Sequence, residues 1–264
     1  MGTYIAAVDA MVDALPREGR RDAGDEMAQA AVAPARRETD TASVTAELRR
    51  TMVDRQLRPF DVTDAPLLDR FLSTPRELFL PEHQANLAYS DLAVTIRGAS
   101  GRARTLLPPL VLARMLQGAA PRPGEKALAI GGAGYSAALL AGLVDDVVVV
   151  ESDPELARLA VAGLCALGVA NVKVETGALS RGAPHLAPYD FILVEGSADA
   201  GLESLLDQLK PEGRLLAIVT PESGAGRQLV RFERVAGKAA GDRPLLSAGA
   251  PVLEGFEKAP SFAF

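Results

Sequence analysis

Residues 127–139, "ALAIGGAGYSAAL", contain the stretch that decides the fold. An apolar run ends at Ile130, a glycine-rich turn follows over residues 131–134, and an alanine-rich stretch begins at Tyr135. A buried strand, a glycine turn and a helix in this order are typical of an α/β fold that binds a cofactor, because glycines let the backbone approach a ligand closely. The stretch therefore predicts a cofactor cradle at residues 131–134.

After residue 124 the chain alternates between predicted strands and predicted helices. Near-continuous apolar runs predict strands at 126–131, 146–152, 171–177, 189–196 and 213–220. The stretches between them predict helices at 135–143, 153–168 and 201–209, and the tail predicts two more strands at 227–237 and 243–253. The expected fold class is α/β, a Rossmann-like doubly wound and mostly parallel sheet with an antiparallel C-terminal edge, preceded by a helical N-terminal segment.

The chain is expected to have three parts. Residues 1–42 are rich in charges, alanine, glycine and proline and contain few large apolar groups, so we expect a flexible extension. Residues 43–120 carry helical apolar spacing and form a predicted helical N-terminal segment. Residues 121–264 form the Rossmann-like domain.

The composition excludes several classes of function. The net charge of −6 gives no support for a nucleic-acid partner. One cysteine and two histidines make a zinc site unlikely and an intrachain disulfide impossible, and Cys165 is expected to be a small core residue. No apolar run reaches the roughly 18 residues of a membrane helix, and the N-terminus lacks a secretory signal. We expect a cytoplasmic protein without a metal.

The predicted strand "VVVVE" ends in Glu151, seventeen residues after Gly134. A carboxylate at this strand end suits a ribose diol, since it can accept hydrogen bonds from both hydroxyls. The alternative is a helix cap, a role that the neighbouring Asp153 can fill by itself. The turn lacks the later helix glycine of the dinucleotide fingerprint, which favours S-adenosylmethionine over NAD because the former carries no pyrophosphate.

Residues 52–92 carry a set of motifs that resembles one enzyme family. These motifs are Met52-Val53, Gln56-Leu57, Pro75-Arg76-Glu77 with Phe79 and Pro81, and Ala88-Tyr89-Ser90-Asp91. They resemble the N-terminal region of protein-L-isoaspartate O-methyltransferases. The resemblance continues through "PPLVLARMLQ", "GYSAALLA", "VVVVESDPELA", "YDFILVEG" and "LKPEGRLLAIV", and it covers about residues 45–255.

The resemblance implies a class I methyltransferase that transfers the methyl group of S-adenosylmethionine to a carboxylate on a protein, a peptide or a small molecule. It implies that residues 43–120 form the substrate-side segment and that residues 121–264 bind this donor. The implied donor-binding residues are Gly131, Gly132, Gly134 and Tyr135 at the methionine part, Glu151 at the ribose, and Ser152, Gly177 and Ala178 near the adenine. The implied acceptor loop contains Thr105 and Leu107.

Three departures from the family pattern bear on activity. Ala129 stands where the family has an acid, and the glycine loop is one residue shorter. Gly177 and Ala178 stand where the family often has Gly-Asp-Gly. The acceptor loop reads "ARTLLPP" at residues 103–109 against a pattern close to "GQTISQP", so Leu107 replaces a serine and cannot donate a hydrogen bond to a carboxylate.

Three hypotheses therefore stand side by side. The first is a methyltransferase of this family, and we expect it to turn over isoaspartyl substrates weakly because of Leu107. The second is a divergent member that binds the donor weakly or not at all and acts as a binding or scaffold protein. The third is an unrelated nucleotide-dependent α/β enzyme. Titration with S-adenosylhomocysteine distinguishes the first two, and the sequence does not give the oligomeric state.

Overall fold

The fold is described from a computed structural model, which describes residues 43–221, 226–235 and 238–258. The predicted extension at 1–42 lies outside these residues. By its internal contacts the chain divides into two units, residues 1–48 and residues 49–264. Everything below on the sheet, its helices and the site concerns the second unit.

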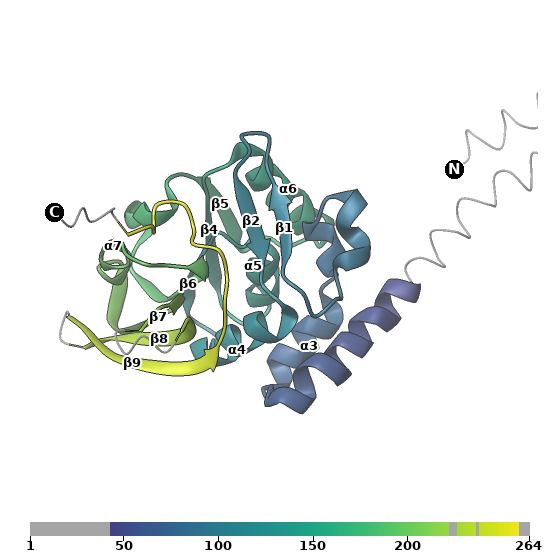
Figure 1. Cartoon of the computed structure of the whole chain (residues 1–264), viewed down its shortest axis with the longest axis horizontal. Coiled ribbons are helices and arrows are strands. Elements are labelled where there is room, and N and C mark those ends of the chain that lie inside the picture. Colours follow the sequence, from purple (N-terminus) through teal and green to yellow (C-terminus); the bar gives the residue numbers. More distant parts are fainter. Residues whose placement is uncertain (1–42, 222–225, 236–237, 259–264) are drawn as a thin grey trace, which may run out of the picture. The chain divides into compact units, whose positions relative to one another are not determined.

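The second unit is built on a seven-stranded sheet with the order β5-β4-β3-β6-β7-β8-β9 (Figure 1). Its strands are β3 (Lys126–Ile130), β4 (Asp146–Glu151), β5 (Val172–Thr176), β6 (Tyr189–Ser197), β7 (Leu209–Val219), β8 (Gln228–Val235) and β9 (Lys238–Ser247). The strands from β5 to β7 are parallel, whereas β8 and β9 are antiparallel to their neighbours. The predicted sheet with its antiparallel C-terminal edge is confirmed.

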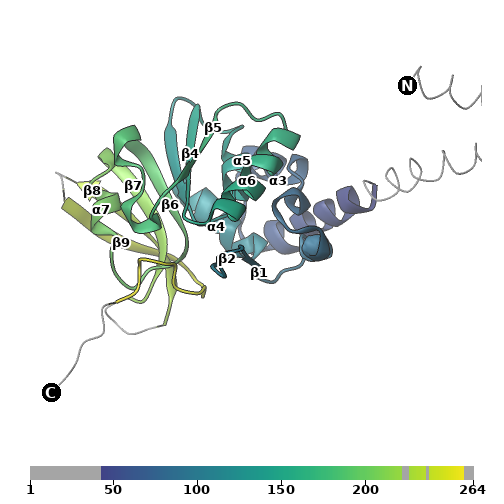
Figure 2. The same ribbon diagram turned by 90° about the horizontal axis from the view of Figure 1, so that it is seen from above.

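Helices cover both faces of this sheet (Figure 2). They are α3 (Ala65–Ser73), α4 (Pro109–Ala119), α5 (Tyr135–Leu140), α6 (Pro154–Ala166) and α7 (Glu203–Leu206). The chain also forms the π-helical segment η1 (Val53–Leu57) and the short 3-10 helices η2 (Arg58–Phe60), η3 (Arg76–Phe79), η4 (Glu82–Leu87), η5 (Leu179–Arg181) and η6 (Pro184–Leu186). Ala127 and Ala129 of β3 belong to a core shared with α3 to α6. Leu128 and Ile130 point to the other core, which contains residues of α7 and η5. Because both faces are buried, the strands are apolar throughout.

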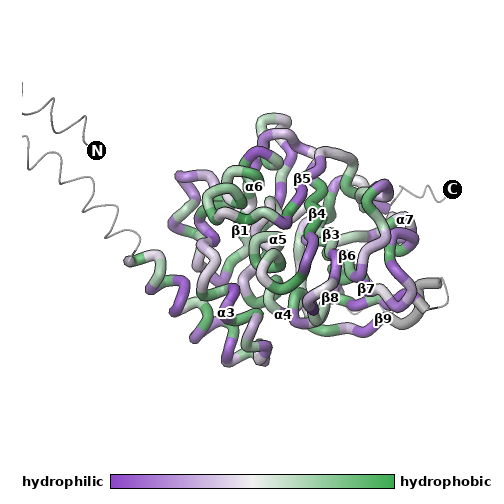
Figure 3. Tube along the Cα trace, turned by 180° about the vertical axis from the view of Figure 1, so that it is seen from behind, coloured by the Kyte–Doolittle hydropathy of each residue, from purple (hydrophilic) through white to green (hydrophobic). Residues whose placement is uncertain are grey.

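The central strands show why the sheet could be predicted from the sequence. Residues 147–150 of β4 are all valine and all buried, and the trace through β4 is coloured as hydrophobic (Figure 3). Valine favours extended backbone because branching at Cβ restricts its side chain. In the sheet β3 lies between β4 and β6, so the chain crosses over at β3, and ligands in such folds bind at the carboxyl ends of the strands beside this switch point.

Four local predictions need correction. The strands β1 (Val94–Arg97) and β2 (Ala103–Leu106) pair as an antiparallel hairpin, whereas the sequence indicated only two separate extended pieces. Helix α7 has four residues instead of the nine at 201–209. The last strand was predicted to reach residue 253, but β9 ends at Ser247. Residues 248–253 instead run across the edge of the sheet, where Val252 pairs with Ser197. Cys165 is exposed on α6 and is not a core residue.

Candidate functional site

The glycine turn lies at the carboxyl end of β3, where the sequence placed the cradle. Gly131 and Gly134 adopt φ values of +80° and +91°, a conformation that side chains with a Cβ rarely adopt. Gly134 also allows close packing, since a Cβ there would lie 2.8 Å from the Cβ of Ala160 in α6. The helix that follows, α5, has only six residues, so its dipole adds little to an anion site.

Glu151 ends β4 beside this turn, and its carboxylate is already paired. Arg104 of β2 donates from Nε to Oε2 at 3.1 Å and from Nη2 to Oε1 at 2.7 Å. The backbone amides of Ser152 and Asp153 also donate to Oε1, at 2.7 and 3.1 Å. Both side chains of the pair are 1 % exposed. The hairpin thus supplies a buried cation for the carboxylate that the sequence assigned to a ribose.

Residues 250–256, which we call the C-terminal strap, run along the end of β6 (Figure 1, Figure 2). The amide of Leu253 donates to the Ser197 carbonyl at 2.9 Å, and the Ser197 amide donates to the Pro251 carbonyl at 2.9 Å. The ring of Phe256 at the end of the strap is fully buried. These contacts hold the strap against the carboxyl edge of the sheet.

The side chain of Leu253 covers the glycine turn. A Cβ on Gly131 would lie 3.0 Å from Leu253 Cδ1, and a Cβ on Gly196 of β6 would lie 2.5 Å from Leu253 Cγ. Glycine at these positions therefore makes room for the protein's own leucine. The Leu253 side chain of the strap therefore fills the space in front of Gly131 and Gly196.

Glu195 is a buried carboxyl that the sequence reasoning missed. It lies near the end of β6, is 2 % exposed, and accepts a hydrogen bond from the Ser136 hydroxyl of α5. A methyl group on Gly132 would overlap the Glu195 carboxylate. Burial raises the pKa of this carboxyl to about 7, although the Ser136 hydrogen bond and the positive charge of Arg76 act in the opposite direction. An acid ending an otherwise apolar strand was the available signal, the same one that singled out Glu151.

A cavity of about 610 Å³ opens between the β1–β2 hairpin and the C-terminal strap. Thr105 and Glu195 line it, together with Arg104 and the strap residues Leu253 and Glu254. A buried titratable group in a cavity at a switch point is typical of a functional site. The cavity places Thr105, a predicted acceptor residue, within the same pocket as the end of β6.

Two of the predicted residues, Leu107 and Tyr135, do not line this cavity and belong to the hydrophobic core. Leu107 is buried, and its carbonyl accepts a hydrogen bond of 2.8 Å from Arg76 Nη2. The Tyr135 ring is buried against Phe71 and Phe79, and burial raises the pKa of its phenol to about 12.

On the adenine side, the Ser152 hydroxyl contacts Arg104 Nη2 at 2.5 Å. The Gly177 amide donates to the Glu151 carbonyl at 2.9 Å, and Ala178 is exposed. The structure thus brings Gly131, Gly132, Glu151 and Ser152 together, and it leaves the Tyr135 side chain in the aromatic core.

The residues around the cradle do not fit S-adenosylmethionine in the arrangement described. Arg104 donates to both oxygens of Glu151 and two backbone amides donate to Oε1, so a ribose diol would compete with these donors. Leu253 and Glu195 occupy the space in front of Gly131 and Gly132. Any donor must therefore displace groups that are hydrogen-bonded and packed.

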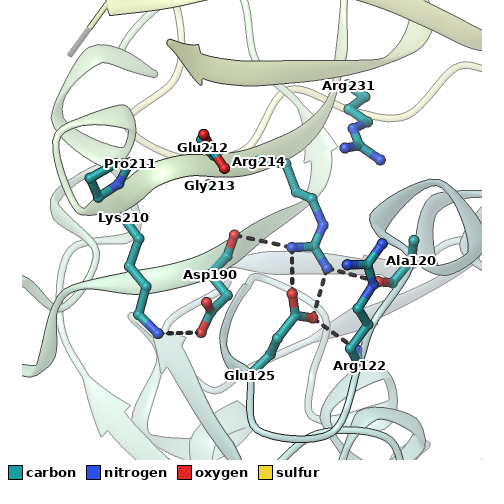
Figure 4. Close-up of a pocket in the computed structure, with 10 residues that line it drawn as sticks. All are labelled: Ala120, Arg122, Glu125, Asp190, Lys210, Pro211, Glu212, Gly213, Arg214 and Arg231. Carbon is teal, nitrogen blue, oxygen red and sulfur yellow. Dashed lines mark hydrogen bonds and ion pairs between the residues drawn. The ribbon is translucent and has the colours of Figure 1, made fainter. Parts of the chain in front are cut away.

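A separate cavity of about 290 Å³ lies at the opposite edge, by the amino ends of β3, β6 and β7 (Figure 4). Arg214 makes a bidentate ion pair with Glu125, both contacts at 2.8 Å, and Lys210 pairs with Asp190 at 2.8 Å. These charges satisfy one another and tie loops together. The Arg214–Glu125 pair, at the edge opposite the glycine turn, provides a useful control for the site.

The described residues contain neither a metal-binding cluster nor a membrane-spanning helix. Within residues 43–221, 226–235 and 238–258, no cluster of three or more His, Cys, Asp or Glu side chains could hold a metal ion. In the same part of the chain, no helix combines the length and apolar character needed to cross a membrane.

Comparison with known proteins points to one family. Residues 49–245 match the sequence pattern described as Protein-L-isoaspartate(D-aspartate) O-methyltransferase (PCMT). The chain is 39 % identical over 197 residues to Protein-L-isoaspartate O-methyltransferase 1 of Rhodopseudomonas palustris (strain HaA2). The aligned residues make up 74 % of this chain and 78 % of that protein. It is 38 % identical over 190 residues to the Protein-L-isoaspartate O-methyltransferase of Methylorubrum extorquens (strain PA1), covering 72 % and 80 %.

Solved structures agree with the fold. A protein-L-isoaspartate O-methyltransferase structure superposes with a TM-score of 0.63 at 25 % identity, over 76 % of this chain and 66 % of that one. A putative protein-L-isoaspartate O-methyltransferase from Plasmodium falciparum, solved in complex with S-adenosyl-L-homocysteine, gives a TM-score of 0.64 at 19 % identity, over 80 % and 98 %. At that identity the second likeness concerns the fold alone.

Proposed function

Because the chain belongs to the protein-L-isoaspartate(D-aspartate) O-methyltransferase family, as its motifs at residues 52–92 predicted, we propose that it is an S-adenosylmethionine-dependent methyltransferase. The family match over residues 49–245 carries this proposal, since it includes the glycine turn, Glu151 and the acceptor loop. The proposed acceptor is a carboxylate on a protein or peptide, in line with the names of the relatives. A small-molecule carboxylate is the alternative acceptor.

In this proposal the donor site is the cradle at the carboxyl ends of β3 and β4, with Glu151 as the ribose ligand. Thr105, which lines the neighbouring cavity, supplies the nearest hydroxyl on the acceptor side. Leu107 offers a carboxylate no hydrogen bond, so isoaspartyl turnover should be weak. We also propose a cytoplasmic location, which is supported by the presence of a single cysteine in the chain.

A second candidate function has one specific observation in its favour. The buried pair between Arg104 and Glu151 occupies the proposed ribose ligand. A chain in which this pair never opens would keep the fold without binding a donor and would act as a binding or scaffold protein.

Calorimetric titration with S-adenosylhomocysteine tests the donor site, and transfer of a labelled methyl group to an isoaspartyl peptide tests the acceptor. The methyltransferase proposal expects measurable binding and slow transfer. An absence of both heat and thermal shift at millimolar ligand would contradict it and favour the scaffold function. Transfer as fast as that of an ordinary family member would instead refute the role given to Leu107.

A further inference from the structure

We propose that the donor cradle of this chain is self-occupied: Arg104 takes the place of the ribose hydroxyls on Glu151 and the C-terminal strap closes the turn, so that S-adenosylmethionine binds only after both are displaced. This inference rests on the proposed function. It adds Arg104 as a residue that sets the affinity for the donor.

The first support is the geometry of Arg104. Its guanidinium gives one N–H group to each oxygen of Glu151, as two neighbouring hydroxyls of a ribose would. Oε1 already accepts from three donors, the Arg104 guanidinium and the amides of Ser152 and Asp153. With three donors in a pair that is 1 % exposed, Oε1 has no acceptor site left, and a ligand hydroxyl that binds there must displace one of these donors.

The second support is that the strap contacts Arg104 and its neighbour Arg102. Glu254 of the strap accepts from the Ser152 hydroxyl at 2.9 Å and pairs with Arg102 of the hairpin at 3.1 Å. Its Oε2 also lies 3.6 Å from Arg104 Nη2. Hairpin, strap and the end of β4 therefore form one connected set of polar contacts, and release of Arg104 should loosen the strap.

The third support is the packing of the strap on glycines from two strand ends. Leu253 lies against Gly131 after β3 and against Gly196 in β6, on either side of the switch point. It belongs to the same buried cluster as Phe256, so the strap is anchored in the core and is more than a surface contact. A ligand of the glycine turn has to move this leucine.

The expected consequence is a reduced apparent affinity. When only a fraction of the molecules is competent to bind, the apparent dissociation constant rises by the inverse of that fraction. If the open arrangement makes up less than about a tenth of the population, the donor binds at least about tenfold more weakly than to an unobstructed cradle.

The test compares S-adenosylhomocysteine binding by calorimetry in the whole chain and its variants. Arg104→Gln removes the guanidinium but keeps an amide donor, and glutamine is also the residue of the family pattern at this place in the acceptor loop. Leu253→Ala opens the turn without touching the ion pair, and it serves if Arg104→Gln fails to fold. Arg214→Gln is the matched control, because it breaks a bidentate arginine pair at the opposite edge of the sheet (Figure 4).

We expect Arg104→Gln and Leu253→Ala to bind S-adenosylhomocysteine at least tenfold more tightly than the unchanged chain does. Arg214→Gln should bind it with the affinity of the unchanged chain. Without ligand, hydrogen exchange at the Leu253 amide should be faster in Arg104→Gln. Equally tight binding by the unchanged chain and Arg104→Gln would overturn the inference and leave the methyltransferase proposal standing. Unchanged exchange at Leu253 would also overturn the inference, whereas no binding by any variant would overturn the proposed function together with it.

Discussion

The buried carboxyl of Glu195 predicts how the stability of the protein depends on pH. Burial raises its pKa from 4.5 to about 7. The folded protein therefore holds this proton more tightly than the unfolded chain does. The stabilisation that results is complete below pH 4.5 and is lost as the pH rises through about 7. At about 1.4 kcal/mol for each pH unit between the two values, the free energy of unfolding should fall by about 3 kcal/mol.

Glu195→Gln isolates this contribution. Glutamine has nearly the same size, stays neutral at every pH, and can still accept the hydrogen bond from Ser136. Urea unfolding at about pH 8 should show the variant to be more stable than the unchanged protein by about 3 kcal/mol. At about pH 5 the two proteins should agree within about 1 kcal/mol, because Glu195 is then neutral in the folded protein and the pH is only slightly above the unfolded pKa of 4.5.

Glu203→Gln is the control, since this glutamate is exposed at the start of α7. The Glu203→Gln variant should have the same free energy of unfolding as the unchanged protein at both pH values. Equal losses of stability between about pH 5 and about pH 8 in Glu195→Gln and the unchanged protein would refute the reasoning. Such a result would mean that the carboxyl is solvated or paired in the folded state.

Two further predictions concern the same edge of the sheet. Gly132→Ala places a methyl group against the Glu195 carboxylate and should lower the free energy of unfolding by about 1–3 kcal/mol in urea unfolding. In the same assay Gly177→Ala, whose Cβ meets nothing within 4 Å, should change the free energy of unfolding by less than about 0.5 kcal/mol. In the Arg104→Gln background, Thr105→Val should lower methyl transfer to an isoaspartyl peptide about tenfold, because it removes a hydroxyl that lines the cavity, and Thr105→Ser should keep the initial rate.

The sheet was predictable from sequence because its strands are buried on both faces. A run such as the valines at 147–150 of β4 leaves little choice of structure, and a glycine turn at the end of such a run marks the crossing to a helix. The predicted position of Glu151 at the carboxyl end of β4 follows from the same local pattern. Local signals of this kind fix which residues reach the edge of the sheet.

Local signals do not determine which distant residues those side chains contact at the edge of the sheet. The partner of Glu151 is Arg104, 47 positions earlier in the chain, and it arrives on a hairpin whose pairing the sequence left open. The strap lies about 100 positions later, with Glu254 contacting Ser152. The hydrophobicity of "APVL" indicated a strand at 250–253, because a segment that packs across an edge buries its side chains just as a strand does.

Two carboxyl groups near the ends of β4 and β6, the strands on either side of β3, are neutralised in two different ways. Glu151 pairs with a guanidinium, and Glu195 has a raised pKa that favours its protonated form. Removal of one partner from a buried pair costs about 3–5 kcal/mol, so Arg104→Gln should be less stable than the unchanged protein. Ribose hydroxyls that replace the lost donors would offset part of this cost only when the ligand is present. S-adenosylhomocysteine should therefore raise the melting temperature of Arg104→Gln more than that of the unchanged protein, and an equal rise would mean that Arg104 does not compete with the ligand.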